Sequence, residues 1–362
     1  MAPLPEKRHP DMKHPALASV AQLGDYDAII DVRTPAEFAE DHVPGAINCP
    51  VLSNEERVAV GTLYKQVSPF EAKKVGAALI SINIARHLQE RFRDMPKEWR
   101  PLIYCWRGGQ RSGAMQIIFR QIGWRADKLD GGYKAFRQHV MEQIDALAPR
   151  FAYRVVCGAT GSGKTRILQA LARQGAQVLD LETLAAHKGS VLGVLPGEPQ
   201  PAQKGFETAL WQALAGFDSS RPVFVEAESR KIGRLHLPDA LLEAVRGGEC
   251  LEVAASLPAR VEFLLRDYDY FLQDPEWLVR RLDNLKELQG KETVARWQAL
   301  AREGGWSQLV QELLDLHYDP HYRRSQGQNY QGRRRHDPFV SDDLSDAGIE
   351  ALAASMLVAA GA

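Results

Sequence analysis

The chain has 362 residues, and typical domain sizes predict two or three folded domains. Hydrophobic residues make up 45% and charged residues 25%, with a formal net charge of -1, so the overall charge names no class of partner. The opening MAPLPEKRHPDMKH has no apolar signal core, and no later apolar run could span a bilayer, so we expect a cytoplasmic protein without a membrane segment. The cysteines, Cys49, Cys105, Cys157 and Cys250, are too scattered for a disulfide framework, and no CxxC pair indicates zinc.

Strand and helix patterns alternate through the first part of the chain. DYDAIIDVR predicts a strand, TPAEFAEDH a helix with a capping box formed by Thr34 and Glu37, and HVPGAINCP a turn and a short strand. A helical stretch over 53–93 is followed by the strand RPLIYC, the loop WRGGQRS and the helix GAMQIIFRQIG, which Gly123 closes. This alternation implies parallel crossovers, so we expect a parallel α/β domain over residues 15–145.

A second α/β domain is expected over residues 150–257, after Pro149. Its predicted elements are the strand RVVC, the helix TRILQALARQ, the strand QVLDL, the helix QKGFETALWQAL and the strand RPVFVEAES. From Pro258 onward helical patterns such as ARVEFLLRDYDYFL and WSQLVQELLDLHY dominate. Residues 258–362 are therefore predicted to form a helical C-terminal extension that includes a basic segment.

The stretch YCWRGGQRSG places Cys105 at the end of a strand and before a helix. The small and charged residues that follow it are Arg107, Gly108, Gly109, Arg111 and Ser112. The glycines let backbone amides turn inward, the arginines add positive charge, and the serine is placed to cap the helix. Such a loop stabilises a thiolate, or an anionic persulfide or perselenide formed on it. Two alternatives stay open: a small buried cysteine, and a cysteine phosphatase whose C-x5-R loop binds phosphate.

DVRTPAEFAEDHVPGAIN adds a second observation for this half of the chain. Together with the cysteine loop, it resembles the rhodanese family of sulfurtransferases. The residues that match the first signature of that family are Asp31, Arg33, Glu37, His42, Pro44, Gly45 and Ala46. The resemblance implies that Cys105 carries the transferred sulfur or selenium, with Arg107 and Arg111 in its catalytic loop. A degenerate, partner-binding rhodanese is the non-catalytic alternative, against which the intact Cys105 and Arg111 argue.

GATGSGKT, residues 158–165, matches the phosphate-loop motif G-x-x-x-x-G-K-[ST] between a predicted strand and a predicted helix. The loop amides would surround a phosphate, Lys164 would bridge its oxygens, and Thr165 would reach Mg²⁺. The glycines that permit this conformation are Gly158, Gly161 and Gly163. The motif indicates a diphosphate-like ligand and does not by itself identify a nucleotide.

Acidic residues follow the neighbouring predicted strands. Asp180 ends QVLD, and Glu226 and Glu228 follow PVFV. At strand ends beside a phosphate loop they would bind metal-bound water, or else they are solvated charges. Cys157, which precedes the loop, is expected to be a core residue.

No acid lies between Asp319 and Asp337. This segment contains Arg323, Arg324, Arg333, Arg334 and Arg335, interleaved with Tyr322 and Tyr330 and preceded by Tyr318. Clustered arginines with aromatic rings favour RNA binding, with a solvated loop as the alternative. Arg280 and Arg281 are weaker RNA-binding candidates. Single histidines such as His187, His317 and His321 could bind a metal but more often make ordinary hydrogen bonds.

Further stretches resemble the tRNA 2-selenouridine synthase family from about Asp25 to about Tyr322. They are YCWRGGQRSG, GATGSGKT, DLETLAAHKGS, QPAQKGFE, VEAESRKIGRLHLP and HYDPHY, with departures at Ala186 and Lys188. The resemblance implies that sulfur is replaced by selenium in the wobble 2-thiouridine of tRNA. It also implies geranyl diphosphate and selenophosphate as co-substrates, and an enzyme that makes selenophosphate as a partner. The alternative from the residues is a nucleotide-dependent kinase or NTPase whose rhodanese module relays sulfur.

Overall fold

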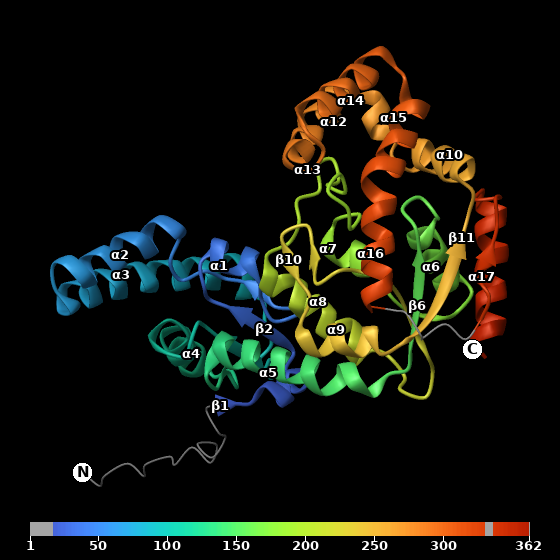
Figure 1. The fold of residues 1–362 in the computed structure, drawn as a ribbon. Helices are drawn as coiled ribbons and strands as arrows, with labels where there is room; N and C mark the ends of the chain where they lie inside the picture. Colours follow the sequence, from blue (N-terminus) through green and yellow to red (C-terminus); the bar gives the residue numbers. More distant parts are fainter. Residues whose placement is uncertain (1–16, 330–335, 362) are drawn as a thin grey trace, which may run out of the picture. The chain divides into compact units, whose positions relative to one another are not determined.

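The computed structural model describes residues 17–329 and 336–361. The chain divides into two compact units between Met141 and Glu142, within helix α5 (Gly132–Leu147). Each unit contains a parallel sheet with helices, as predicted (Figure 1). In the described part of the chain, no helix is both long enough and apolar enough to cross a bilayer.

The first unit is built on a five-stranded sheet in the order β1-β5-β4-β2-β3, with every neighbouring pair parallel. Its strands are β1 (Leu17–Ala18), β2 (Ala28–Asp31), β3 (Ile47–Asn48), β4 (Pro101–Tyr104) and β5 (Asp127–Leu129). Ile30 and Ile103, on the adjacent strands β2 and β4, are paired in register and fully buried. This burial explains why both strands read as short apolar runs.

Two helices of the first unit have a predicted local signal at one end, α1 (Pro35–Glu40) at its N-terminus and α4 (Gln110–Ile122) at its C-terminus. The other α-helices before α5 are α2 (Asn54–Gln66) and α3 (Pro69–His87). Thr34 and Glu37 form the predicted capping box of α1. Gly123 ends α4 in the left-handed conformation, with φ +112°, which a glycine adopts without steric cost.

The second unit has a five-stranded parallel sheet in the order β12-β11-β6-β8-β7. Its strands are β6 (Tyr153–Gly158), β7 (Gln177–Leu179), β8 (Val223–Glu226), β11 (Glu249–Ala254) and β12 (Phe339–Val340). A separate antiparallel pair consists of β9 (Lys231–Ile232) and β10 (Leu235–His236). β6 is the central strand of the five, so the loop that follows it lies between two neighbouring strand ends.

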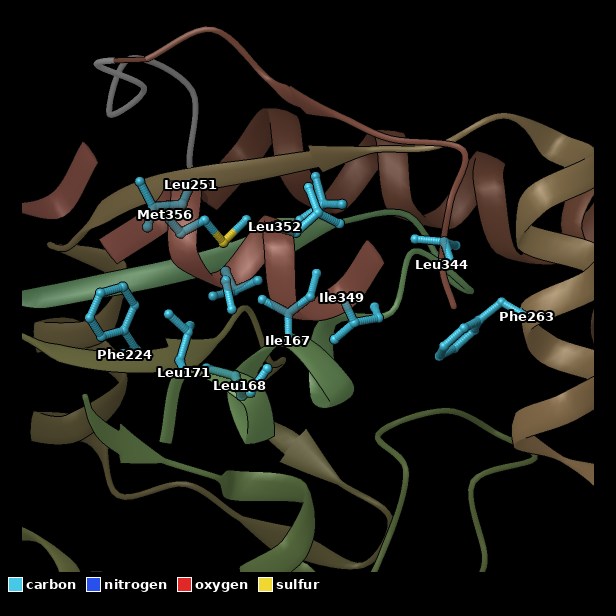
Figure 2. Close-up of a cluster of buried hydrophobic side chains, with 14 residues drawn as sticks. Ile167, Leu168, Leu171, Phe224, Leu251, Phe263, Leu344, Ile349, Leu352 and Met356 are labelled. Carbon is cyan, nitrogen blue, oxygen red and sulfur yellow. The ribbon is translucent and has the colours of Figure 1, made fainter. Parts of the chain in front are cut away.

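Helices cover this sheet and extend beyond it. They are α6 (Lys164–Arg173), α7 (Leu181–Ala185), α8 (Gln203–Ala215), α9 (Asp239–Arg246) and α17 (Asp346–Ala360). Figure 2 shows Ile349, Leu352 and Met356 of α17 beside Ile167 and Leu171 of α6, in one buried apolar cluster. The C-terminal region is therefore more than a helical extension, because β12 and α17 complete the second sheet and its core.

Between β11 and β12, residues 257–329 form a group of helices (Figure 1). They are α10 (Leu257–Asp267), α11 (Asp269–Gln273), α12 (Pro275–Leu282), α13 (Lys286–Gln289), α14 (Lys291–Glu303), α15 (Trp306–Leu313) and α16 (Asp319–Asn329). Trp297 is fully buried in a separate apolar cluster that these helices share. The helical group thus has its own core beside the sheet.

Cys157 on β6 and Cys250 on β11 are paired as a disulfide, while Cys49 and Cys105 are free and buried. The sequence indicated no disulfide framework and did not predict this single pair. The two residues are separated by 93 positions in sequence, and only the parallel pairing of β6 with β11 brings them together. Cys157 is fully buried, as expected for a core residue.

Candidate functional site

Cys105 follows β4 directly, at the start of the predicted loop, and its side chain is only 4% exposed. Its Sγ accepts a hydrogen bond from the Ser112 hydroxyl at 3.3 Å. The expected capping role of Ser112 is wrong, because α4 begins at Gln110 and Gly109 is its N-cap residue. Ser112 instead lies in the first turn of α4, where its hydroxyl contacts the sulfur.

The N-terminus of α5 closes the cysteine loop. The backbone N–H of Tyr133 donates to the Cys105 carbonyl at 2.8 Å, and that of Lys134 donates to the Trp106 carbonyl at 3.0 Å. Gly132 has φ +60°, and a Cβ there would overlap the Cys105 carbonyl oxygen. The sequence analysis missed this support, although the adjacent glycines in DGGY were a usable signal.

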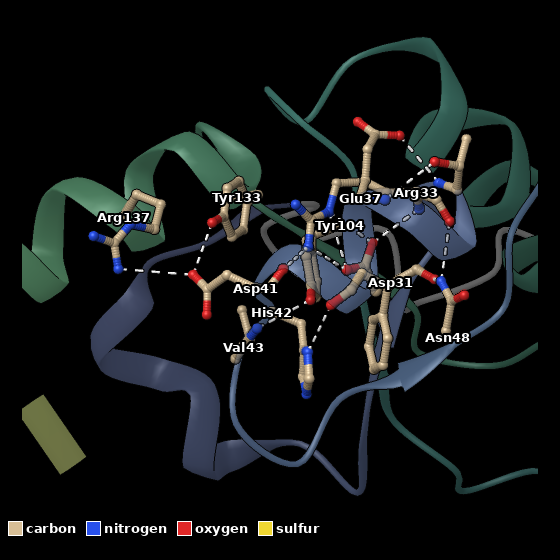
Figure 3. A network of polar contacts seen from close by, with 12 residues as sticks. Asp31, Arg33, Glu37, Asp41, His42, Val43, Asn48, Tyr104, Tyr133 and Arg137 are labelled. Carbon is tan, nitrogen blue, oxygen red and sulfur yellow. Dashed lines mark hydrogen bonds and ion pairs between the residues drawn. The ribbon is translucent and has the colours of Figure 1, made fainter. Parts of the chain in front are cut away.

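The first rhodanese signature forms a buried polar network (Figure 3). The Arg33 guanidinium binds the Asp31 carboxylate, with a shortest N–O distance of 2.6 Å, and donates to the Asp41 carbonyl at 2.7 Å. It also lies 3.7 Å from the ring centroid of Tyr133, whose hydroxyl donates to Asp41 Oδ2 at 2.7 Å. Because Tyr133 also holds the Cys105 carbonyl, the network fixes the backbone at the cysteine.

The two predicted catalytic arginines differ in their surroundings. Arg111 donates to both carboxylate oxygens of Glu37, at 2.7 and 3.1 Å, whereas the side chain of Arg107 is exposed. Burial opposes the charge of Glu37, but the hydrogen bonds and charge of Arg111 outweigh it and lower the pKa of Glu37. An anion bound by Arg111 would therefore share that arginine with Glu37.

In the second unit, the phosphate loop connects β6 to α6, as predicted. Gly163 is the N-cap residue of α6 with φ +81°, and Gly161 has φ +84°. All five predicted diphosphate-binding residues line one pocket of about 470 Å³, namely Gly158, Gly161, Gly163, Lys164 and Thr165. The motif therefore opens into a cavity that could hold a ligand.

Acidic side chains surround Lys164 in this pocket. Lys164 Nζ donates to the Gly158 carbonyl at 2.8 Å. Burial lowers the pKa of Lys164, and the negative charges of Glu182 and Glu228 act in the opposite direction. The Thr165 hydroxyl donates to Glu182 Oε2 at 2.7 Å. Glu182 was not predicted as a site residue, although it lies in the DLETLAAHKGS stretch.

The three predicted acids have different positions. Asp180 caps α7, where its carboxylate accepts from the Thr183 N–H and hydroxyl, each at 2.8 Å. Glu226 is 1% exposed, and its Oε1 accepts from the Glu182 N–H at 2.7 Å. Glu228 lines the pocket, and burial together with the charge of Glu182 raises its pKa to about 8. Of the three, Glu228 reaches the phosphate-loop pocket, while Glu226 positions Glu182 from below.

The opposite side of the pocket comes from the helical group. Arg260 on α10 donates to the Thr160 carbonyl of the phosphate loop at 2.8 Å and forms an ion pair with Asp319 on α16 at 2.6 Å. These contacts connect both helices to the loop. Lys188 Nζ lies 2.6 Å from Asp267 Oδ2 and 4.1 Å from the ring centroid of Tyr268. The pocket wall on this side is largely apolar and aromatic, with Phe263, Leu264, Tyr268, Leu288 and Tyr318.

The structure describes only part of the predicted RNA-binding segment. Arg323 and Arg324 are exposed on α16, and Tyr322 lines the phosphate-loop pocket. Arg333, Arg334, Arg335 and Tyr330 lie outside the described residues. His187 and His317 are buried, and no group of three or more acids, histidines or cysteines suited to a metal occurs among the described residues.

Comparison with known proteins gives the same division of the chain. Residues 17–139 match the rhodanese-like domain family, and residues 151–281 match the tRNA 2-selenouridine synthase AAA domain family. A tRNA 2-selenouridine synthase of Nitrosomonas europaea is 38% identical over 244 residues, or 66% of this chain and 63% of that protein. Another of Alcanivorax borkumensis is 32% identical over 326 residues, or 81% of this chain and 88% of that protein. A solved N-terminal domain from Clostridium difficile 630 is 35% identical and covers 34% of this chain and 98% of its own, with a TM-score of 0.31.

Proposed function

Since the chain belongs to the tRNA 2-selenouridine synthase family, we propose that it replaces the sulfur of wobble 2-thiouridine in tRNA with selenium, in two steps. The first step attaches a geranyl group to the sulfur, and the second exchanges the alkylated sulfur for selenium. The observation that carries this proposal is the presence of two different glycine-rich loops at strand ends, one in each unit, at Cys105 and at residues 158–165. Both loops are of a kind suited to anions.

In the first step, the thione sulfur attacks C1 of geranyl diphosphate. The new C–S bond forms as the C–O bond breaks, the diphosphate leaves, and the base loses its N3 proton. Negative charge grows on the departing diphosphate, and the amides of the phosphate loop together with Lys164 are suited to stabilise it. Thr165 and Glu182 are the residues that would hold a Mg²⁺ ion here, because Mg²⁺ typically takes one or two protein carboxylates besides phosphate and water. Such an ion would supply further positive charge at the leaving group.

The second step depends on the first because a thione sulfur is a poor leaving group. Once alkylated, the sulfur can depart as geranyl thiol after a selenium nucleophile adds to C2, so that a C–Se bond replaces the C–S bond. Selenophosphate is the proposed donor: its selenium adds to C2, geranyl thiol leaves, and water takes up the phosphoryl group as phosphate, so no oxidant or reductant is needed. Cys105 and its loop are proposed to receive and position this selenium for the addition. The Ser112 hydroxyl donates a hydrogen bond to the Cys105 sulfur. An enzyme that makes selenophosphate is the corresponding proposed partner.

The RNA substrate is proposed to contact the basic segment, including Arg323 and Arg324 on α16. Arginine side chains bind phosphates, and nearby tyrosines stack on unpaired bases. Arg333, Arg334 and Arg335 continue this segment in the sequence.

The phosphate loop also favours a second candidate, a nucleotide-dependent kinase or NTPase. The two functions separate in one experiment, in which the full chain is incubated with 2-thiouridine tRNA, geranyl diphosphate and selenophosphate without ATP. Mass spectrometry of the digested nucleosides should then show 2-selenouridine, with the S-geranyl nucleoside when selenophosphate is left out. A strict requirement for ATP would instead support the kinase.

A further inference from the structure

A second cavity continues from the phosphate-loop pocket into the helical group. It has a volume of about 70 Å³. Five residues line both cavities, namely Thr160, Ser190, Leu264, Tyr268 and Tyr318. The two cavities therefore meet at a shared wall, with the phosphate loop on one side and the helical group on the other.

The lining of this second cavity is apolar and contains no charged side chain. Beyond the shared wall it is formed by Leu192, Leu265, Phe271, Leu272, Leu278, Trp306, Leu309, Val310, Leu313 and Leu314. Leu309 and Leu314 are fully buried, and Phe271 and Leu278 are at most 5% exposed. An apolar cavity of this kind favours hydrocarbon over water.

We propose that this cavity, here called the chain cavity, binds the hydrocarbon chain of the prenyl diphosphate whose diphosphate lies on the phosphate loop. The inference rests on the proposed function and adds where the chain lies and which residues limit its length. The inner wall on α15, which includes Trp306, Leu309 and Val310, sets that limit. A volume of about 70 Å³ holds only a few carbon atoms, so the chain cavity receives the far end of a ten-carbon chain, whose first carbons lie along the apolar wall of the phosphate-loop pocket. Longer prenyl chains are selected against.

The lining of the chain cavity also argues against a nucleotide whose base enters this cavity. A purine base carries ring nitrogens and an exocyclic group that need hydrogen-bond partners once they leave water. The chain cavity offers few polar side-chain groups: the hydroxyls of Thr160, Ser190, Tyr268 and Tyr318 at its shared wall, and the indole N–H of Trp306. The methyl-branched chain of a prenyl group requires no hydrogen-bond partner.

The first test measures binding by calorimetry, using the full chain with geranyl, dimethylallyl and inorganic diphosphate and with ADP. Each buried methylene contributes about 0.8 kcal/mol, or about fourfold in affinity, so geranyl diphosphate, with five more carbons, should bind on the order of 1000-fold more tightly than the five-carbon dimethylallyl diphosphate. Similar dissociation constants for these two ligands would overturn the inference.

The second test changes the cavity wall. Val310 is half-buried on α15, so Val310→Phe should fill the chain cavity with little effect on the fold. We expect the Kd of geranyl diphosphate to rise roughly tenfold or more and that of inorganic diphosphate to change less than about twofold. Val358→Phe, at a side chain of α17 that is 84% exposed, is the matched control.

Val310→Ala tests the length limit in the opposite direction and serves if the larger side chain prevents folding. It should improve binding of fifteen-carbon farnesyl diphosphate relative to geranyl diphosphate. An unchanged Kd of geranyl diphosphate in Val310→Phe, or an unchanged chain-length preference in Val310→Ala, would overturn the chain placement and leave the proposed function intact. A wild-type chain that binds ADP in preference to geranyl diphosphate would overturn the proposed function itself.

Discussion

At the scale of single residues, Cys105 and Cys49 are both free, buried thiols of the first unit, but their surroundings differ. The sulfur of Cys105 accepts a hydrogen bond from Ser112 and lies at the start of a helix-terminal loop. Burial raises the pKa of the Cys49 thiol to about 11, which keeps that residue protonated and unreactive. This contrast gives a matched pair for testing the role of the cysteine loop.

Cys105→Ala should abolish selenium incorporation while leaving S-geranylation of 2-thiouridine largely intact, since only the second step needs a selenium carrier. Cys49→Ala, the control, should retain both activities. Nucleoside mass spectrometry after each half-reaction measures the two steps separately. Loss of both activities in a folded Cys105→Ala variant would contradict this division of labour.

His317 gives a prediction about stability and pH. Burial, with the nearby charge of His321, lowers the pKa of His317 to about 4, below the unfolded value of about 6.5. The unfolded state therefore binds the proton more readily, so stability is lost as the pH falls below 6.5. Between pH 7 and pH 5 this effect is worth about 2 kcal/mol.

His317→Gln removes this contribution. Urea unfolding should show that the free energy of unfolding falls less between pH 7 and pH 5 in this variant than in the wild-type chain. His236→Gln, at an exposed histidine of the same unit, should follow the wild-type pH dependence. Parallel pH curves for wild type and His317→Gln would disprove the assignment.

At the scale of elements, α17 and β12 make the C-terminal segment part of the second sheet's core. Met356 is fully buried against this core, whereas Val358 on the same helix is 84% exposed. Met356→Ala should lower the free energy of unfolding by about 2–5 kcal/mol, because it leaves a cavity. Val358→Ala should change it by less than about 0.5 kcal/mol in a urea titration. Equal effects of the two substitutions would mean that α17 does not pack in this way.

The basic segment provides a second prediction at this scale. Replacing Arg333, Arg334 and Arg335 together by Ala should weaken tRNA binding and flatten its dependence on salt. Each lost phosphate contact should lower the slope of log K against log salt by about 0.7–0.9. Filter binding at several salt concentrations measures both quantities. The control is Arg302→Ala, since Arg302 is already paired with Glu276 at 2.7 Å. An unchanged slope of log K against log salt would instead support the interpretation of this segment as a solvated loop.

At the scale of the whole molecule, the proposed steps use different loops and should be separable. Lys164→Ala should block S-geranylation, because the charge on the departing diphosphate loses its stabilising lysine. The same variant, given tRNA that already carries the geranylated base, should still exchange it for selenium, since that step releases a thiol and no diphosphate. Nucleoside analysis from both starting tRNAs measures this, and normal geranylation by Lys164→Ala would refute the assignment of the phosphate loop.

The features that sequence predicted well are those encoded in consecutive residues. The capping box at Thr34, the helix end at Gly123 and the loop over 158–165 each depend on neighbours in the chain. The missed features depend on contacts between distant segments. Glu182 reaches Thr165 only because β7 and β8 lie side by side and Glu226 accepts from its N–H, and Tyr133 supports Cys105 from another helix. A single sequence carries no direct record of such contacts.

The position of α17 also has a consequence for how the protein is made. Every strand of the first sheet lies within residues 17–129, so that sheet can close while later residues are still being translated. The second sheet needs β12 and α17, which are synthesised roughly 10 to 40 s after β6 at elongation rates of about 5–20 residues per second. During that interval the apolar side chains of β6 and α6 lack part of their native cover. The nascent second unit is therefore the stage at which a chaperone would find exposed apolar surface on this protein.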